Sequence, residues 1–181
     1  MLNDRAIADR AAQGMITPFC DHKCRELGPS YGLGSAGYDC RLGDTLWIAR
    51  PGAGIVDVAD PRAIEEMFDP VKARSWVLMP GMFVLGATVE HFAIPRDLVG
   101  LCIGKSTLRR LGHVADMTPL EPGWHGNLVL ELNFTLPRPV RIHAGMGIAQ
   151  IMFDELSEHC VRDYGDLKGK YQGQTGVVGA R

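Results

Sequence analysis

Glycine, proline and aspartate divide this chain into many short apolar segments. The 181 residues include 22 glycines and 11 prolines. Short apolar runs bounded by such turn-forming residues are typical of brief strands. We expect strands over residues 45–49, 75–79, 82–88, 98–103, 127–133, 140–142 and 148–153. The pattern predicts an all-β sandwich or barrel with tight corners rather than a helical bundle.

Three short helices complete the predicted elements. Residues 4–14 form an amphipathic segment with Asn3 or Asp4 as the N-cap and Gly14 as its terminator. Residues 60–68 begin with Asp-Pro, a helix-initiating pair, and residues 106–111 end at Gly112. There is no internal repeat and no low-complexity linker, so we expect a single domain over residues 1–181.

Composition excludes several classes of protein. Hydrophobic residues make up 46% and charged residues 22% of the chain, which is typical of a globular domain. The formal charge of −2 offers no general attraction for nucleic acid or an anionic membrane, and no apolar run approaches the roughly 20 residues of a membrane helix. Five cysteines form an odd set without CxxC spacing, and the N-terminus lacks an apolar signal core. We therefore expect a cytoplasmic protein without a nucleic-acid or membrane partner.

Three soft metal ligands lie within five residues at Cys20, His22 and Cys24. Zinc sites usually have a fourth ligand and favour CxxC-type spacing, and neither is found here. The favoured interpretation is ordinary, scattered loop residues, with a metal site as the alternative.

Residues 104–112 read GKSTLRRLG, a strand that ends in glycine and opens into a helix. Unpaired backbone N–H groups, hydroxyls and cations at such a point can bind phosphate. The P-loop motif GxxxxGK[ST] is not met, because Val99 stands where its first glycine belongs. A capped surface helix with solvated arginines is the alternative.

Glu131 interrupts an apolar strand formed by residues 127–133. Burying an unpaired carboxylate costs several kcal/mol, so we expect it either to pair with an arginine or to line a polar cavity. In a cavity, desolvation would prepare it to act as a general base.

The C-terminal residues 164–176 are polar, glycine-rich and interspersed with tyrosine. Most termini of this kind are loosely ordered tails. The same residues would also suit a lid that folds over an anionic ligand.

Three blocks of sequence, in this order, resemble dCTP deaminases: GKSTLRRLG, TPLEPGWHGNLVLE (residues 118–131) and GKYQGQTG (residues 169–176). YGLGSAGYDCRLG (residues 31–43) and GMGIAQ (residues 145–150) are also similar to segments of that family. The likeness covers most of residues 1–178. It implies a dUTPase-like fold, a distorted jelly-roll or β-clip barrel with a few short helices, and a homotrimer with active sites at the subunit interfaces.

The resemblance also implies a role for each matching residue. Glu131 would be the general base, and Ser106 and Arg110 would position the attacking water. Residues 164–181 would form a C-terminal lid. Nucleotide contacts would come from Lys105, Ser106, Thr107, Arg110, Pro119, Glu121, Trp124, Val129, Tyr164, Lys170, Tyr171 and Gln174.

The implied reaction converts dCTP and water to dUTP and ammonia, and so feeds dUMP and dTTP synthesis. Mg²⁺ would accompany the triphosphate, bound mainly through phosphate oxygens rather than by the protein. No zinc is expected, because zinc-dependent cytosine deaminases carry HxE and PCxxC motifs that this chain lacks. dTTP is the expected inhibitor.

Departures from the family pattern leave alternatives open. Lys105 replaces a frequent arginine, Asp116 adds a carboxylate beside the expected base pocket, and residues 132–134 read Leu-Asn-Phe. A 5-substituted dCTP could therefore be the substrate. A bifunctional deaminase and dUTPase is disfavoured by the short turn Leu120-Glu121-Pro122, and a non-catalytic nucleotide sensor is the third alternative.

Overall fold

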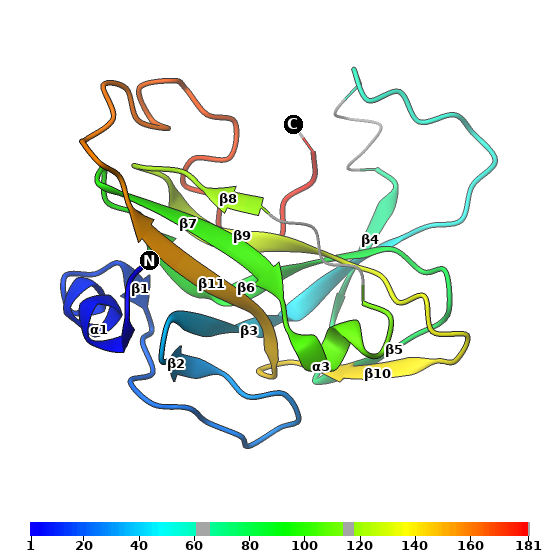
Figure 1. Ribbon diagram of the computed structural model, residues 1–181. Helices are drawn as coiled ribbons and strands as arrows, with labels where there is room; N and C mark the ends of the chain where they lie inside the picture. Colours follow the sequence, from blue (N-terminus) through cyan, green and yellow to red (C-terminus); the bar gives the residue numbers. More distant parts are fainter. Residues whose placement is uncertain (61–65, 114–117, 181) are drawn as a thin grey trace.

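The computed structural model describes residues 1–60, 66–113 and 118–180, and it is mainly β (Figure 1). The described residues form two short helices, α1 (Asp4–Ala12) and α3 (Ser106–Arg109). The mainly β prediction is confirmed. The strands are β1 (Ile16–Thr17), β2 (Gly32–Gly34), β3 (Gly37–Ala49), β4 (Phe68–Lys72), β5 (Ser75–Leu78), β6 (Val84–Ala93), β7 (Leu98–Gly104), β8 (Thr118–Leu120), β9 (His125–Leu132), β10 (Val140–His143) and β11 (Gly147–Glu155).

In the part of the chain that the structure describes, most strands belong to one sheet of nine strands. Its main path runs β1-β6-β3-β11-β7-β8, with β2 and β4 paired to β3 and β9 paired to β6, while β10 and β5 form a separate pair. The sheet curls, so that β7 and β11 lie in front of β6 and β9 in the view of Figure 1. Tyr38, Phe92 and Phe153 are fully buried in the hydrophobic core between these parts.

The helix predictions are confirmed at both ends of α1. The Asn3 side chain accepts the Ala6 N–H at 3.0 Å, Ile7 and Ala11 are buried, and Gly14 ends the segment with φ of 96°. α3 is a single turn, and Gly112 follows it with φ of 82°. These caps satisfy backbone groups that a helix end would otherwise leave unpaired.

The predicted helix over residues 60–68 lies partly outside the described residues, which omit 61–65. Its expected last residue, Phe68, instead begins β4, so that end of the prediction is wrong. β4 pairs with residues 45–49 of β3, and this pairing gives β4 its extended conformation.

All seven predicted strands are present, but β3 begins at Gly37 rather than at residue 45. The added part alternates the buried Tyr38, Cys40 and Leu42 with aspartate, arginine and glycine, and this short alternation was not predicted as a strand. It is extended because β2, β6 and β11 supply its backbone partners. Strands β1, β2, β4 and β8 were not predicted from the sequence. They are short strands defined by pairing rather than by composition. Among the described residues, no helix is long and apolar enough to cross a membrane.

Candidate active site

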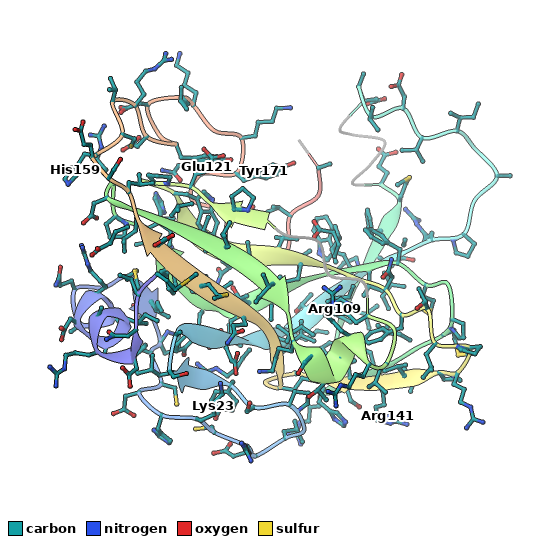
Figure 2. The ribbon with its side chains drawn as sticks, viewed as in Figure 1. Lys23, Arg109, Glu121, Arg141, His159 and Tyr171 are labelled. Atoms are coloured by element: carbon teal, nitrogen blue, oxygen red, sulfur yellow. The ribbon has the colours of Figure 1, made fainter. Side chains whose placement is uncertain are left out.

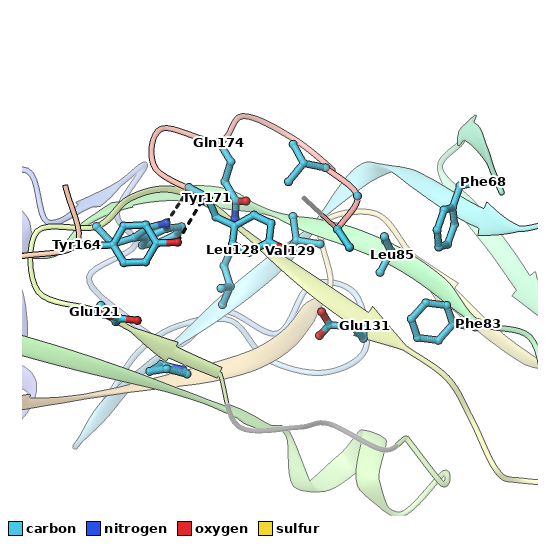
Figure 3. A pocket seen from close by; sticks show the side chains of 15 residues that line it. Phe68, Phe83, Leu85, Glu121, Leu128, Val129, Glu131, Tyr164, Tyr171 and Gln174 are labelled. Atoms are coloured by element: carbon cyan, nitrogen blue, oxygen red, sulfur yellow. Dashed lines mark hydrogen bonds between the residues drawn. The ribbon is translucent and has the colours of Figure 1, made fainter. Parts of the chain in front are cut away.

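A cavity of about 510 Å³ lies between β9, the turn after β8 and the C-terminal segment (Figure 3). Its volume suits a ligand of nucleoside size. The walls are mostly apolar, with carboxylates at two separate positions, Glu121 and Glu131. The described lining residues are Phe68, Phe83, Leu85, Pro119, Glu121, Trp124, Leu128, Val129, Glu131, Tyr164, Tyr171, Gln174, Val178, Gly179 and Ala180.

Glu131 lies on the face of β9 that looks away from the core. Along β9 the side chains alternate, so that Leu130 and Leu132 are buried while Glu131 is exposed. The backbone of Glu131 is held opposite Leu85 of β6. In the single chain the Glu131 carboxylate is therefore not buried, so the predicted buried ion pair with an arginine is wrong. The position of Glu131 on a cavity wall agrees with the other interpretation, although that interpretation expected a polar cavity and this one is mostly apolar.

The turn before β9 forms a second wall of the cavity. Trp124 is 5% exposed, and its indole N–H donates to the Tyr171 carbonyl at 2.9 Å. The Trp124 backbone N–H donates to the Glu121 carbonyl at 3.0 Å, which closes the turn. Gly123 has φ of 77°, and an added Cβ would lie 2.6 Å from the Asp163 side chain. The turn thus packs tightly between β9 and the C-terminal segment.

The C-terminal segment covers the cavity and is held by specific hydrogen bonds. The Tyr171 N–H donates to the Tyr164 hydroxyl at 3.1 Å. Gln174 is 6% exposed; its side-chain amide donates to the Asn127 carbonyl at 2.7 Å, and the Asn127 N–H donates to the Gln174 carbonyl at 3.0 Å. Gln174 therefore extends the edge of β9 by a parallel bridge at Gly126. The interpretation of this segment as a loosely ordered tail is wrong.

The structure divides the predicted site residues into two groups. Those that line the cavity together are Pro119, Glu121, Trp124, Val129, Glu131, Tyr164, Tyr171 and Gln174. Those that do not line it are Lys105, Ser106, Thr107, Arg110 and Lys170.

Four residues of the second group lie on or next to α3: Ser106 and Thr107 belong to the helix, and Lys105 and Arg110 flank it. Ser106, Thr107 and Arg110 are exposed. Figure 2 shows Arg109 on α3 well apart from Glu121 and Tyr171. The Lys105 ammonium lies 2.6 Å from Oδ2 of the buried Asp39, and its side chain is only 10% exposed. Asp116, the unusual carboxylate in the sequence, lies outside the described residues.

An apolar end of the cavity was not predicted. Phe68 and Phe83 lie there with ring centroids 6.2 Å apart, beside Leu85. Val178, from the C-terminal segment, also lines the cavity. In the sequence, the apolar pair Val177-Val178 is the signal for this part of the cavity. The pair follows a polar segment, which indicates that the chain packs against the protein again at this point.

The family to which this chain belongs is shown by comparison with known proteins. A family model described as dCTP deaminase-like matches residues 1–156, and the chain belongs to this family. Curated dCTP deaminases are similar over nearly their whole length. That of Acidobacterium capsulatum is 41% identical over 178 residues, covering 97% of this chain and 96% of the relative. That of Herpetosiphon aurantiacus is 45% identical over 179 residues, covering 97% and 95%.

A solved structure supports the fold. The 2′-deoxycytidine 5′-triphosphate deaminase of Agrobacterium tumefaciens matches with a TM-score of 0.65 at 22% identity. The match covers 92% of this chain and 51% of that chain, so this chain spans about half the length of that protein. The predicted fold class is confirmed.

Proposed function

We propose that this protein hydrolyses dCTP to dUTP and ammonia, without zinc in the reaction. The observation that carries the proposal is Glu131, a carboxylate held by strand pairing on the wall of a cavity of nucleoside size. Membership of the dCTP deaminase-like family supports the choice of substrate. The product dUTP would supply dUMP and dTTP synthesis.

In the proposed reaction Glu131 acts as the general base. It removes a proton from a water molecule as the water oxygen bonds to cytosine C4. Glu131 delivers this proton to ring N3. It then carries the proton of the new C4 hydroxyl to the exocyclic amine, and as the C4=O bond forms the C4–N bond breaks and releases ammonia. Pairing of β9 with β6 fixes the backbone that carries this carboxylate, so that its side chain starts from a defined point on the cavity wall.

The remaining cavity residues would hold the nucleoside. Trp124 is fixed by its bond to the Tyr171 carbonyl and would bound the deoxyribose, leaving no room for a 2′-hydroxyl. Glu121 would accept from the sugar hydroxyl. The base would lie along the apolar wall. Proposed contacts are made by Pro119, Glu121, Trp124, Val129, Tyr164 and Tyr171.

The triphosphate would be bound by a second subunit. Lys105, Ser106, Thr107 and Arg110 are absent from the described lining of the cavity in their own chain, although they form the strongest anion-binding segment. We therefore propose a homotrimer in which α3 of one subunit completes the cavity of the next. Ser106 and Arg110 would then position the water beside Glu131.

Residues 164–181 would act as a lid of this single domain, with Lys170 and Gln174 turned towards the phosphates. The hydrogen bonds of Gln174 to β9 support a closed position of the segment. dTTP would compete with dCTP for the cavity, because its thymine base has the same ring size as cytosine. The two bases differ in their groups at C4 and C5. A cytoplasmic location stays a prediction, supported by five free thiols.

Mg²⁺ would enter on the nucleotide. The described residues that line the cavity include neither histidine nor cysteine, and its two carboxylates belong to no described group of three possible ligands. This donor set fits a cation that is coordinated by phosphate oxygens and water.

The test measures ammonia and pyrophosphate released from dCTP, dCMP, CTP and 5-methyl-dCTP with Mg²⁺. We expect ammonia from dCTP and no pyrophosphate. Pyrophosphate as well would identify the bifunctional enzyme, and faster release from 5-methyl-dCTP would identify a modified substrate. Nucleotide binding without ammonia would overturn the proposal in favour of a sensor.

A further inference from the structure

Cys20, His22 and Cys24 lie together in the loop between β1 and β2, separate from the cavity. Their possible ligand atoms are all within 4.8 Å of one another. This loop lies at the bottom of Figure 2, where Lys23 is labelled, while Glu121 and Tyr171 lie at the top. The interpretation of these three residues as scattered is therefore wrong.

The distances resemble those of a tetrahedral zinc site. The two Sγ atoms are 3.4 Å apart, and Cys24 Sγ is 3.3 Å from His22 Nε2. Zn–S bonds of about 2.3 Å and Zn–N bonds of about 2.0 Å at tetrahedral angles require about 3.8 Å and about 3.5 Å for these pairs. Small side-chain rotations would make up the difference, because His22 is exposed and both thiols are half-buried.

The environment of His22 matches that of a metal ligand. Its Nδ1 is 2.7 Å from Asp21 Oδ1, so Nδ1–H donates to the carboxylate and the lone pair is on Nε2, the nitrogen nearest Cys24. A carboxylate bound to the outer nitrogen is the usual partner of a zinc-bound histidine, since it orients the ring and raises its basicity.

The loop is also held in place without a metal. The backbone groups of Cys24 and Tyr31 exchange hydrogen bonds of 2.9 and 3.1 Å, and the Leu33 N–H donates to the Cys20 carbonyl at 3.0 Å. The Arg41 guanidinium lies over the Tyr31 ring at 4.9 Å from its centroid, which also holds this side of the loop in place. A largely preformed site lowers the entropic cost of binding an ion.

We propose that Cys20, His22 and Cys24 bind one Zn²⁺ ion, with water as the fourth ligand. Binding forms two Zn–S bonds and one Zn–N bond, and the two thiol protons pass to solvent. The ion would tie together a loop in which Lys23, 2.7 Å from Asp39, approaches the same carboxylate as Lys105. The site is separate from the deamination chemistry.

The experiment titrates Co²⁺, then Zn²⁺, into reduced, metal-free protein without an affinity tag. Co²⁺ bound by thiolates gives a near-ultraviolet charge-transfer band, and tetrahedral geometry gives intense visible bands. We expect saturation at one ion per chain and displacement by Zn²⁺. Cys20→Ser and Cys24→Ser should each abolish tight binding, and Asp21→Asn should weaken it by about 10- to 100-fold. Cys160→Ser, which alters a half-buried thiol elsewhere, is the matched control and should bind as the wild type does.

Three results would overturn the proposal. These are no thiolate band at one equivalent of Co²⁺, a band that survives Cys20→Ser and Cys24→Ser, or equal loss in Cys160→Ser. Formation of a Cys20–Cys24 disulfide by a protein that binds no metal when reduced would assign the pair to redox chemistry instead. Circular dichroism checks that the serine variants fold, and His22→Gln provides a test that leaves both thiols intact. Because the readout is spectroscopic, it stands whether or not dCTP is the substrate.

Discussion

The cavity beside β9 and the segment around α3 contain the two halves of the predicted site, and they differ in how complete they are. Eight predicted residues converge on the cavity within one chain, held by strand pairing and by hydrogen bonds from the C-terminal segment. Ser106, Thr107 and Arg110 on or next to α3 are exposed and line no part of it.

α3 is nevertheless fixed firmly to the protein. Its own Leu108 is buried, and the Thr135 N–H donates to the Gly112 carbonyl at 2.9 Å. His113 Nδ1 donates to the Asn133 carbonyl at 3.1 Å, one residue beyond the end of β9. The helix is thus presented rigidly on the surface, as expected for a group that serves a neighbouring subunit.

The largest effect is expected for Glu131→Gln. The amide cannot accept a proton from water, so kcat should fall by about 100-fold or more while nucleotide binding and the fold persist. Ammonia release and calorimetric titration with dCTP check both parts. Glu158→Gln, at an exposed position, is the control for loss of a carboxylate. Retention of more than about a tenth of the wild-type rate would exclude Glu131 as the general base.

Mixing two inactive variants tests the division of the site directly. Glu131→Gln damages the cavity and Arg110→Ala damages the α3 group, so each alone should be inactive. If each site of a trimer takes one group from each of two subunits, random reassembly restores both intact groups in about a quarter of the sites. The rate of the mixture, compared with each variant taken through the same reassembly, is the measurement. No recovery in mixed trimers would place both groups in one subunit.

A smaller effect is expected from weakening the lid. Lys170→Ala combined with Gln174→Ala removes a cation and the side-chain bond to the Asn127 carbonyl. We expect KM for dCTP to rise by about tenfold, with a smaller fall in kcat, because the lid mainly holds the nucleotide. Steady-state kinetics give both constants, and Arg162→Ala is the control for charge loss in the same region. A fall in kcat alone would instead assign the segment to the chemical step.

The smallest effect concerns the attachment of α3. Burial lowers the pKa of His113, so the folded protein binds its proton less readily than the unfolded chain does. The stability that neutral His113 contributes is present above the unfolded pKa of about 6.5 and is lost as pH falls towards the lowered value.

We therefore expect Tm to fall by a few degrees between about pH 6.5 and pH 5, and to fall less in His113→Asn, which keeps a donor but does not titrate. Thermal unfolding of both proteins across this range is the measurement, and His159→Asn, at an exposed position, is the control. Parallel curves for wild type and His113→Asn would contradict the assignment.

Much of this molecule could be predicted before its structure was known. The alternation of short apolar runs with glycine and proline specifies strands, because such runs can bury only one narrow face each. Asn3, Gly14 and Gly112 mark the helix ends through local backbone chemistry. The order and spacing of the motif blocks indicated the family to which the chain belongs.

Other features were decided only by tertiary structure. Glu131 faces the cavity because of the register of β9 on β6, and a shift of one residue would turn it to the opposite face. The C-terminal segment is ordered because Gln174 finds backbone partners on β9, which no local pattern reveals. Cys20, His22 and Cys24 converge because pairing of the loop with Tyr31 and Leu33 bends it back on itself. Residue types and local conformation follow from neighbours in the chain, whereas a site depends on contacts between distant segments.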